Sequence, residues 1–555
     1  MIVKKIRTHQ LHLFVAILAL AFTALSLTPG YIAGSGPAWL HLSGDVAQGQ
    51  IGWWYFAHDA WRFPVFDVRN YNLPEGSNLL LSDSLPLFAL PAKLLYRATG
   101  WLPIYIGLWA ALCLLLQVLF ASRLLRTLDV RTPLAHFSGV VLLSYAPVLF
   151  MRIGQNTLLA QFILLATIEI YLRGKRDGLT LRDWLIFGAW PLSALLVHPY
   201  LAVMAGLMFA ISLIDQWRAR CLSKIQAAQY LAALLIAGLS LSYCGGFLFA
   251  GSNYGDYGMY SLNVLAPFVP FAETTMGGWL GSSSPTIPDI HQWDGGCYLG
   301  AGILLLLLLA LPAWRSAISS LRRHATLAII FTLLLLFAIS NRIGFGEHEL
   351  LHIPLPDSLI SLLSTFRGSG RFAWLPLYAG STFLIMLIQR RFGSRAGSLI
   401  LCIAALLQLA DVAPMQASPR DGTALANTPN VHVDTWQRLI AAHQDIFQYP
   451  SFECGALYGR GIPGTHFSEL EIEWIAAQLN RPTNSAYLAR PHKDCVQEQI
   501  EASGNKAVPG RLYLYRSSED VGTYLAANGV KMDRCGLLDD VVVCSADQDL
   551  STLQP

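Results

Sequence analysis

Eleven long apolar segments dominate the sequence and constrain its fold more strongly than any other feature. Each is close in length to the roughly 20 residues that an α-helix needs to cross a hydrocarbon core. Hydrophobic residues make up 54% of the 555 residues and charged residues only 13%, about half the charged share of a soluble domain. We therefore predict a polytopic α-helical membrane protein. The spans are expected at residues 11–29, 101–122, 132–150, 156–173, 183–197, 199–214, 226–248, 298–314, 325–341, 371–389 and 396–412.

Basic residues gather in every second connection between these segments. Because Lys and Arg are enriched in cytoplasmic loops, the alternation predicts a cytoplasmic N-terminus, and an odd number of spans then places the C-terminal part outside. The first apolar run resembles a signal peptide, but we interpret it as an uncleaved first span, since no small-x-small cleavage site follows it. The basic connections hold Lys4 and Arg7, Arg123 and Arg126, Arg173 and Lys175, Arg218 and Arg220, Arg322 and Arg323, and Arg390 and Arg391.

The long connections all fall on the predicted outer face, at residues 30–100, 249–297 and 342–370. The basic face has only short connectors, so we expect any chemistry on the outer face. That location argues against an enzyme that uses ATP or a nucleotide sugar. The sequence also contains no GxxxxGK[ST] phosphate loop. We predict two domains, a transmembrane domain over residues 1–412 and an extracytoplasmic domain over residues 413–555.

The second domain has the pattern of a small α/β fold. Helices are predicted at 435–443, 468–480 and 517–529, with Ser468 and Glu471 forming a capping box at the start of the second. Strands are predicted at 445–450, 511–516 and 540–544. Four cysteines in an extracytoplasmic domain suggest two disulfides. We pair Cys535 with Cys544 across a hairpin and Cys454 with Cys495, although three pairings, or four free thiols, are open.

The first outer loop combines carboxylates with aromatic residues typical of a membrane interface. Apolar residues at helical spacing predict two interfacial helices, one over residues 47–61 and one from Ser82–Asp83 through Leu95. Asp45 and Asp83 would then lie at helix starts. Each could be an N-cap. Asp45 could instead accept a proton from an attacking hydroxyl or hold a divalent cation, Mg²⁺ or Mn²⁺.

A second set of candidates is basic and lies at the outer ends of spans. Basic residues are uncommon at the outer ends of spans, so the position of Arg152, Arg367 and Arg371 requires an explanation. Arginine binds phosphate bidentately, although these side chains could also snorkel to lipid headgroups. His198 could bind a phosphate or a sugar, or simply pack at a helix end. Asp294 in HQWDGGCYLG is a further carboxylate candidate.

Several segments resemble a known superfamily. SGDVAQGQIGWWYF, NYNLPEGSNLLLSDSLPLFAL, YGMYSLNVLAPF, HQWDGGCYLGAG and FRGSGRFAWLPLY resemble segments of an uncharacterised family of bacterial membrane proteins similar to GT-C glycosyltransferases. The resemblance implies a bacterial inner-membrane enzyme that moves a sugar from a polyprenyl-phosphate donor on the outer face. It implies that Asp45 is the base or metal ligand and that Arg371 binds the donor phosphate. The acidic pairs of that superfamily are absent, because Val46 and Ala47 follow Asp45, which leaves metal dependence and activity open.

Two other functions are compatible with the sequence. One is a transporter or flippase of lipid-linked glycans, which would have charged residues near the bilayer midplane and repeated halves with broken helices. The sequence has few charged residues within the predicted spans and no convincing internal repeat. A non-catalytic assembly protein would use the tail domain for docking. The partners expected of the enzyme are the lipid bilayer, the lipid-linked donor and a glycan, lipid or protein acceptor, with no nucleic acid.

Overall fold

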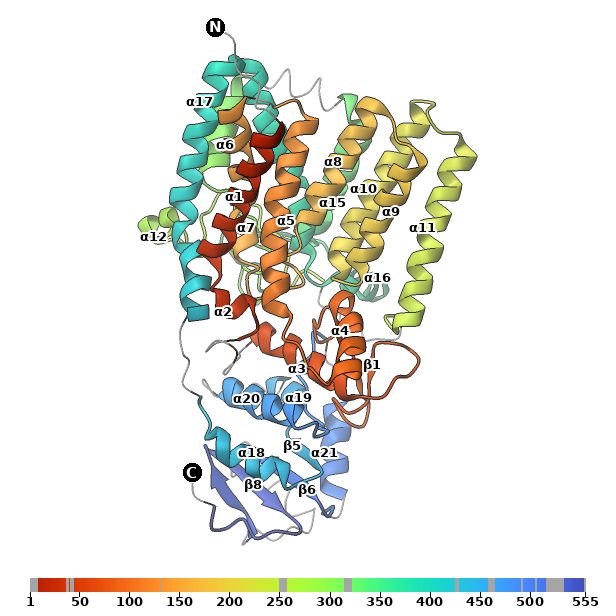
Figure 1. The fold of residues 1–555 in the computed structure, drawn as a ribbon, viewed down its shortest axis with the longest axis vertical. Coiled ribbons are helices and arrows are strands. Elements are labelled where there is room, and N and C mark those ends of the chain that lie inside the picture. The colour runs from red at the N-terminus through yellow and green to blue at the C-terminus, as the bar shows by residue number, and fades with distance from the viewer. Residues whose placement is uncertain are drawn as a thin grey trace. The chain divides into compact units, whose positions relative to one another are not determined.

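The computed structural model describes residues 8–35, 39, 44–130, 132–248, 257–313, 322–424, 429–457, 465–490, 493–504, 507–515 and 534–553. These residues are mostly helical (Figure 1). The chain divides into two compact units. Unit 1 comprises Met1–Ile32, Leu108–Gly238 and Asn253–Thr423, and unit 2 comprises Ala33–Gly107, Leu239–Ser252 and Ala424–Pro555. The first outer loop therefore groups with the C-terminal residues, whereas composition alone divides the chain at residue 412.

Every predicted apolar segment contains a helix. Within unit 1, helices α8, α9 and α10 pack against one another (Figure 1). Four described helical segments are long and apolar enough to cross a membrane, at Ile106–Thr127, Pro199–Arg218, Lys224–Gly245 and Ser369–Gly422. The number of crossings remains a prediction. The helices are α1 Thr8–Ser26, α2 Pro29–Ile32, α5 Ile106–Thr127, α6 Pro133–Ser144, α7 Pro147–Phe150, α8 Phe162–Asp177, α9 Leu181–Leu195, α10 Pro199–Arg218, α11 Lys224–Gly245, α12 Thr275–Leu280, α13 Ala301–Ala310, α15 Ala325–Ile339, α16 Asp357–Leu363 and α17 Trp374–Ala424.

Helix α17 contains the last two predicted segments, and Gly393 separates them. The backbone of Gly393 has φ 74° and ψ 179°, which is not helical. Glycine adopts positive φ without the Cβ clash that other residues meet. Two helices therefore follow each other across a kink at the place where the hydropathy pattern predicted a connection.

The outer connection at 342–370 contains a hairpin that the sequence analysis missed. Strand β3 (Arg342–Phe345) pairs antiparallel with β4 (His348–His352). A short 3₁₀ turn at Ser369–Ala373 then leads directly into α17. This turn includes the last four residues of the glycine-rich FRGSGRF motif, so a tight turn rather than an open loop presents Arg371.

Unit 2 contains a four-stranded sheet of order β5-β6-β8-β7. Strands β5 and β6 are parallel, and the other two pairings are antiparallel. Three predicted strands are confirmed by β5, β6 and β8, whereas the predicted helix at 517–529 lies outside the described residues. The elements are β5 Asp445–Tyr449, β6 Arg511–Tyr515, β7 Gly536–Leu538 and β8 Val541–Ser545, with α18 Val433–Ala441, α19 Phe452–Leu457, α20 Thr465–Gln478 and α21 Cys495–Gly504.

Two disulfides join the cysteines of this domain in the pairs expected from the sequence. Cys454 bonds to Cys495, and Cys535 bonds to Cys544 across the β7–β8 hairpin. Cys544 also lies in a buried cluster with the tyrosines of β5 and β6. The second disulfide therefore connects the edge strand to the core of the sheet.

The predicted capping box in α20 is wrong. The helix begins at Thr465, so Ser468 lies inside it rather than before it. The carboxylate of Glu471 accepts hydrogen bonds from the backbone N–H of Asn430 at 3.0 Å and from its Nδ2 at 2.9 Å. The Glu471 side chain therefore binds a distant segment instead of capping the start of its own helix.

Helix α3 (Gly44–His58) corrects the prediction of an interfacial helix over residues 47–61. Its residues are buried all round from Ala47 to Ala57, whereas an interfacial helix has one polar, exposed face. The rings of Trp54 and Trp474 of α20 lie 4.3 Å apart, and Tyr55 stacks on Tyr71. The aromatic residues of loop one therefore form a core with the C-terminal domain.

The second loop helix, α4, runs from Pro86 to Thr99 and has a different start from the one predicted. Leu85 precedes it as the N-cap residue with φ 56°, so Asp83 does not cap the helix. Asp83 itself has φ 51° and is half-buried. Leu94 and Leu95 on α4 are exposed, which is the feature expected of a helix at a membrane interface.

Candidate functional site

Four of the predicted site residues meet in unit 1, and we call this group the arginine cluster. It consists of Arg152, His198, Asp294 and Arg371. Arg152 follows α7, His198 is the N-cap residue of α10, and Arg371 lies in the 3₁₀ turn before α17. Asp294 lies in the connection before α13. The cluster is therefore assembled from four separate parts of the chain.

Asp294 is shared by two guanidinium groups. Its Oδ1 accepts from Arg152 Nη1 at 2.6 Å, and its Oδ2 accepts from Arg371 Nη2 at 2.9 Å and Nε at 3.2 Å. Arg152 also donates to the backbone oxygen of Asp294. The side chains of Arg152 and Asp294 are 2% and 4% exposed, whereas that of Arg371 is 16% exposed. Arg371 is thus the member of this triad that a ligand could reach most easily.

Glycines explain how these segments approach so closely. A Cβ atom on Gly370 would lie 2.6 Å from the Cα of Gly295, and one on Gly295 would lie 2.3 Å from the backbone oxygen of Ser261. Both distances are too short for any other residue. The N–H of Gly370 donates to the oxygen of Tyr260 at 3.1 Å. Backbone packing therefore joins the YGMYSLNVLAPF, HQWDGGCYLG and FRGSGRF segments and brings Asp294 to Arg371.

Electrostatics keeps the carboxylate of Asp294 ionised. Burial by itself would raise its pKa, but the guanidinium groups of Arg152 and Arg371 outweigh burial and hold the pKa well below the usual range. Burial, together with the same two arginines, lowers the pKa of His198 well below its usual value. His198 is therefore neutral at pH 7, and the cluster carries one net positive charge.

The aromatic neighbours orient the two arginines. Arg152 lies over the ring of Trp374 at 5.3 Å, and Arg371 lies over the ring of Tyr200 at 5.2 Å. The Nδ1 of His198 accepts a hydrogen bond from the N–H of Tyr200 at 3.3 Å, so His198 also serves as the packing residue considered from sequence. Arg367 lies against the ring of Tyr260 and has no hydrogen bond to Asp294 among the described contacts.

Asp45 lies in unit 2, in the first turn of α3, and is half-buried. Its Oδ1 accepts a hydrogen bond from the hydroxyl of Tyr487 at 2.9 Å. A carboxylate in the first turn of a helix is also favoured by the helix dipole. Tyr487 had no sequence signal, because 442 residues separate it from Asp45.

Unit 2 also contains a cavity of about 340 Å³ that the sequence analysis missed. We call it the polar pocket. The guanidinium of Arg511 lies 3.4 Å from the ring centre of Phe447, and Lys493 Nζ lies 3.6 Å from the carboxylate of Glu498. The pocket is lined by Leu73, Pro74, Glu75, Phe447, Tyr449, Asn484, Lys493, Asp494, Gln497, Glu498 and Arg511. Its wall thus combines aromatic rings with carboxylates and amides.

In the described part of the chain, no three His, Cys, Asp or Glu side chains are arranged to hold a metal ion together. The carboxylate of Asp45 has the Tyr487 hydroxyl as its hydrogen-bond partner. A divalent cation at Asp45 remains an alternative to the role of proton acceptor.

Comparison with known families gives two adjacent matches. Residues 16–413 match a family model described as a domain of unknown function, DUF6311, and residues 435–546 match the model of the DUF6311 C-terminal domain. No curated protein matches the chain. Since the first model alone covers more than half of the sequence, this protein belongs to the DUF6311 family.

Proposed function

We propose that this protein is a membrane glycosyltransferase of the GT-C type. It would transfer a sugar from a polyprenyl-phosphate donor to an acceptor on the outer face of a bacterial inner membrane. The proposal includes the predicted topology of eleven spans with a cytoplasmic N-terminus and a periplasmic C-terminal domain. The observation that carries it is the arginine cluster, in which four candidate residues from distant segments come together.

The cluster has the chemistry expected of a site for a phosphate group. It carries a net positive charge, because one carboxylate is shared by two guanidinium groups. Arginine recognises phosphate through paired N–H donors, and the partly exposed Arg371 is the residue to which we assign this role. Arg152 is fully buried and positions Asp294, which in turn positions Arg371.

Asp45 is the residue to which we assign proton transfer. An acceptor hydroxyl would attack the anomeric carbon, the new carbon–oxygen bond would form as the bond to the lipid phosphate breaks, and the hydroxyl proton would pass to the Asp45 carboxylate. The Tyr487 hydroxyl, 2.9 Å from Asp45 Oδ1, would orient this carboxylate. Positioned general bases typically contribute about 10²–10⁴-fold to a rate.

The polar pocket of unit 2 supports a role for that unit in binding the acceptor. Sugars present apolar ring faces together with many hydroxyl groups. The pocket provides the rings of Phe447 and Tyr449 as well as the side chains of Asn484, Asp494 and Gln497. A cavity of about 340 Å³ has the size class of small-ligand sites.

The test uses the purified full-length protein in proteoliposomes, with polyprenyl-phosphate-linked glucose, mannose and galactose as donors and a bacterial cell-envelope extract that contains glycans, lipids and proteins as the source of acceptor. Release of polyprenyl phosphate is measured. Asp45→Asn should reduce release by about 10²-fold or more, and Arg371→Lys should raise the donor KM about tenfold, because lysine keeps the charge but loses the paired donors. Arg342→Lys, in the β3–β4 hairpin, is the matched control for the second variant and should behave like the unmodified protein.

Membrane abundance and thermal midpoint are measured for each variant, so that loss of folding is separated from loss of activity. If Asp45→Asn folds normally and still releases polyprenyl phosphate at the unmodified rate, the assignment of Asp45 is wrong. If no donor is turned over while labelled lipid-linked glycan moves between leaflets, the protein is a flippase rather than a transferase.

A further inference from the structure

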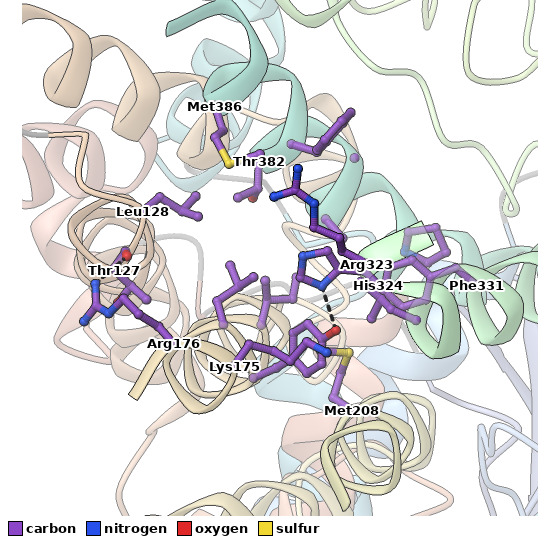
Figure 2. Close-up of a pocket in the computed structure, with 18 of the residues that line it drawn as sticks. Thr127, Leu128, Lys175, Arg176, Met208, Arg323, His324, Phe331, Thr382 and Met386 are labelled. Carbon is purple, nitrogen blue, oxygen red and sulfur yellow. Dashed lines mark hydrogen bonds between the residues drawn. The ribbon is translucent and has the colours of Figure 1, made fainter. Parts of the chain in front are cut away.

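Unit 1 contains a cavity of about 600 Å³ whose lining residues do not include the arginine cluster. Figure 2 shows side chains from several helices arranged around an open hollow. Helices α5, α8, α10, α15 and α17 all contribute to it. The lining residues are Thr127, Leu128, Asp129, Ile168, Tyr171, Leu172, Lys175, Arg176, Met208, Arg323, His324, Leu327, Phe331, Pro376, Ala379, Gly380, Thr382, Phe383, Met386 and Arg390.

The charged residues of this cavity are mostly basic. Its lining includes Lys175, Arg176, Arg323 and Arg390 against a single acid, Asp129. In Figure 2, Arg176 and Arg323 lie on opposite sides of the hollow, with Lys175 between them. Such a ring of cations attracts an anion, and arginine in particular matches the geometry of a phosphate.

Two of these cations already have acidic partners. Lys175 Nζ lies 2.9 Å from Asp215 Oδ2, and Arg176 Nη2 lies 2.8 Å from Asp177 Oδ2. Asp215 is also held by the hydroxyls of Tyr171 and Thr326, so this side of the cavity is a fixed network.

Arg323 and Arg390 differ from the other two cations. Both are exposed, and neither has an ion pair with any residue in the described ranges. They come from different elements, Arg323 from just before α15 and Arg390 from within α17. An anion between them would therefore supply a partner that the described protein lacks.

Most of the remaining wall is apolar, although Thr127, Tyr171, His324 and Thr382 also line the cavity. Met208 is fully buried, and Leu172, Phe331 and Met386 are half-buried. The cations, in contrast, are all exposed or partly exposed. A ligand that satisfies both parts of the wall has an anionic head and an apolar tail. Free phosphate would leave the apolar surface uncovered.

We propose that this cavity binds a phosphate-bearing lipid, with the headgroup between Arg323 and Arg390 and an acyl chain against Met208, Phe331 and Met386. All four cations belong to connections that the charge alternation assigns to the cytoplasmic face, and basic pockets between helices on that face suit anionic lipid headgroups. The inference rests on this cavity alone and does not depend on glycosyl transfer.

The experiment measures the thermal midpoint of the purified full-length protein in dodecyl maltoside against added phosphatidylglycerol. Phosphatidylcholine with the same acyl chains and inorganic phosphate are separate arms. Saturable stabilisation by phosphatidylglycerol is expected, with much less from either of the others. Arg323→Gln combined with Arg390→Gln should weaken the apparent affinity for phosphatidylglycerol about tenfold or more, because each basic residue near an anionic headgroup strengthens lipid binding.

The matched control is Arg322→Gln combined with Arg391→Gln. These residues are the immediate neighbours of the tested pair, and neither lines the cavity. The charge change is the same, so the control should keep the affinity of the unmodified protein. Equal losses in the two double variants would overturn the proposal in favour of unspecific surface charge.

A third variant tests the cavity without changing its charge. A Cβ on Gly380 would meet nothing within 4 Å, and Gly380 lines the cavity, so Gly380→Phe should fill the space and reduce lipid binding. Unchanged binding in this variant would overturn the proposed position of the lipid. Stabilisation by inorganic phosphate equal to that by phosphatidylglycerol would overturn the lipid in favour of a free anion.

Discussion

Asp294 shows how a single residue can hold a buried cationic site together. Two arginines near each other in a dry interior would repel one another and lose their hydration. The carboxylate of Asp294 lies between them and accepts hydrogen bonds from both. This double pairing offsets the cost of burying the carboxylate, which makes the triad sensitive to the loss of Asp294.

We expect Asp294→Asn to destabilise the protein by about 3–5 kcal/mol, the range found when one partner of a buried ion pair is removed. The amide keeps the shape of the side chain but removes the negative charge that both guanidinium groups contact. Unfolding in detergent micelles measures the change. Asp289→Asn is the control, because Asp289 is exposed in the same connection and its φ of 65° suits asparagine.

The stability difference between the unmodified protein and Asp294→Asn should depend on pH. Because the pKa of Asp294 is lowered in the folded state, its ionised form stabilises the fold at pH values above the unfolded value of about 4. This contribution is lost as the pH falls from about 4 toward the folded pKa. The stability difference between the unmodified protein and Asp294→Asn should therefore shrink below about pH 4. A constant difference would contradict the pairing.

At the scale of single elements, the β7–β8 hairpin has a turn with unusual backbone angles. Asp539 and Asp540 connect the two strands and have φ values of 49° and 62°. Two consecutive positive φ values are typical of a type I′ turn, which matches the twist of the strands and favours Asn or Asp followed by Gly. Asp539 is further held because its Oδ2 accepts from Trp436 Nε1 at 2.9 Å.

We expect Asp540→Gly to stabilise the protein by about 0.5–1 kcal/mol, because glycine adopts positive φ without steric cost. Asp540 is exposed, so its replacement removes no packing contact in the core. Asp540→Ala should destabilise, since alanine lacks the local hydrogen bonding that lets aspartate tolerate this conformation. Thermal unfolding of the full-length protein measures both. The same sign of change for glycine and alanine would argue against the turn type.

At the scale of the whole molecule, the first outer loop and the C-terminal domain share one core in unit 2. The hydroxyl of Tyr55 donates to the oxygen of Arg481 at 2.8 Å, and Trp54 packs on Trp474. Lys493 donates to the backbone oxygen of Leu73 at 3.0 Å. Loop one is thus structurally part of the C-terminal domain, although the long span-rich region separates the two in sequence.

We expect Trp54→Ala to destabilise unit 2 by about 3–5 kcal/mol, the range for removal of a large aromatic residue from a core. Hydrogen exchange should increase both in α3 and in α20, because the two helices lose a shared contact. Trp61→Ala is the control, since Trp61 is 46% exposed whereas Trp54 is 4% exposed. Increased exchange in α3 alone would mean that α20 is stable without loop one.

The local parts of this architecture were predictable. Hydropathy located the helical segments, because a chain that crosses lipid must satisfy its backbone hydrogen bonds internally. The sequence pattern also predicted β5, β6 and β8, with a period of two in β6. In two places where prediction failed, a side chain or helix face contacts a distant segment instead of its expected surroundings. Glu471 bonds Asn430 rather than its own helix start, and α3 is buried on the side that was expected to face water.

The candidate site was predictable only as a set of residue types. The sequence by itself determined which arginines and carboxylates were unusual, because a charge at the outer end of a span or inside an aromatic loop is costly without a partner. Only the tertiary structure decided which of them meet. Asp294 and Arg152 are 142 residues apart, and Tyr487 lies still further from Asp45. Such pairs depend on close backbone packing, as between Gly295 and Gly370, whose geometry no local pattern encodes.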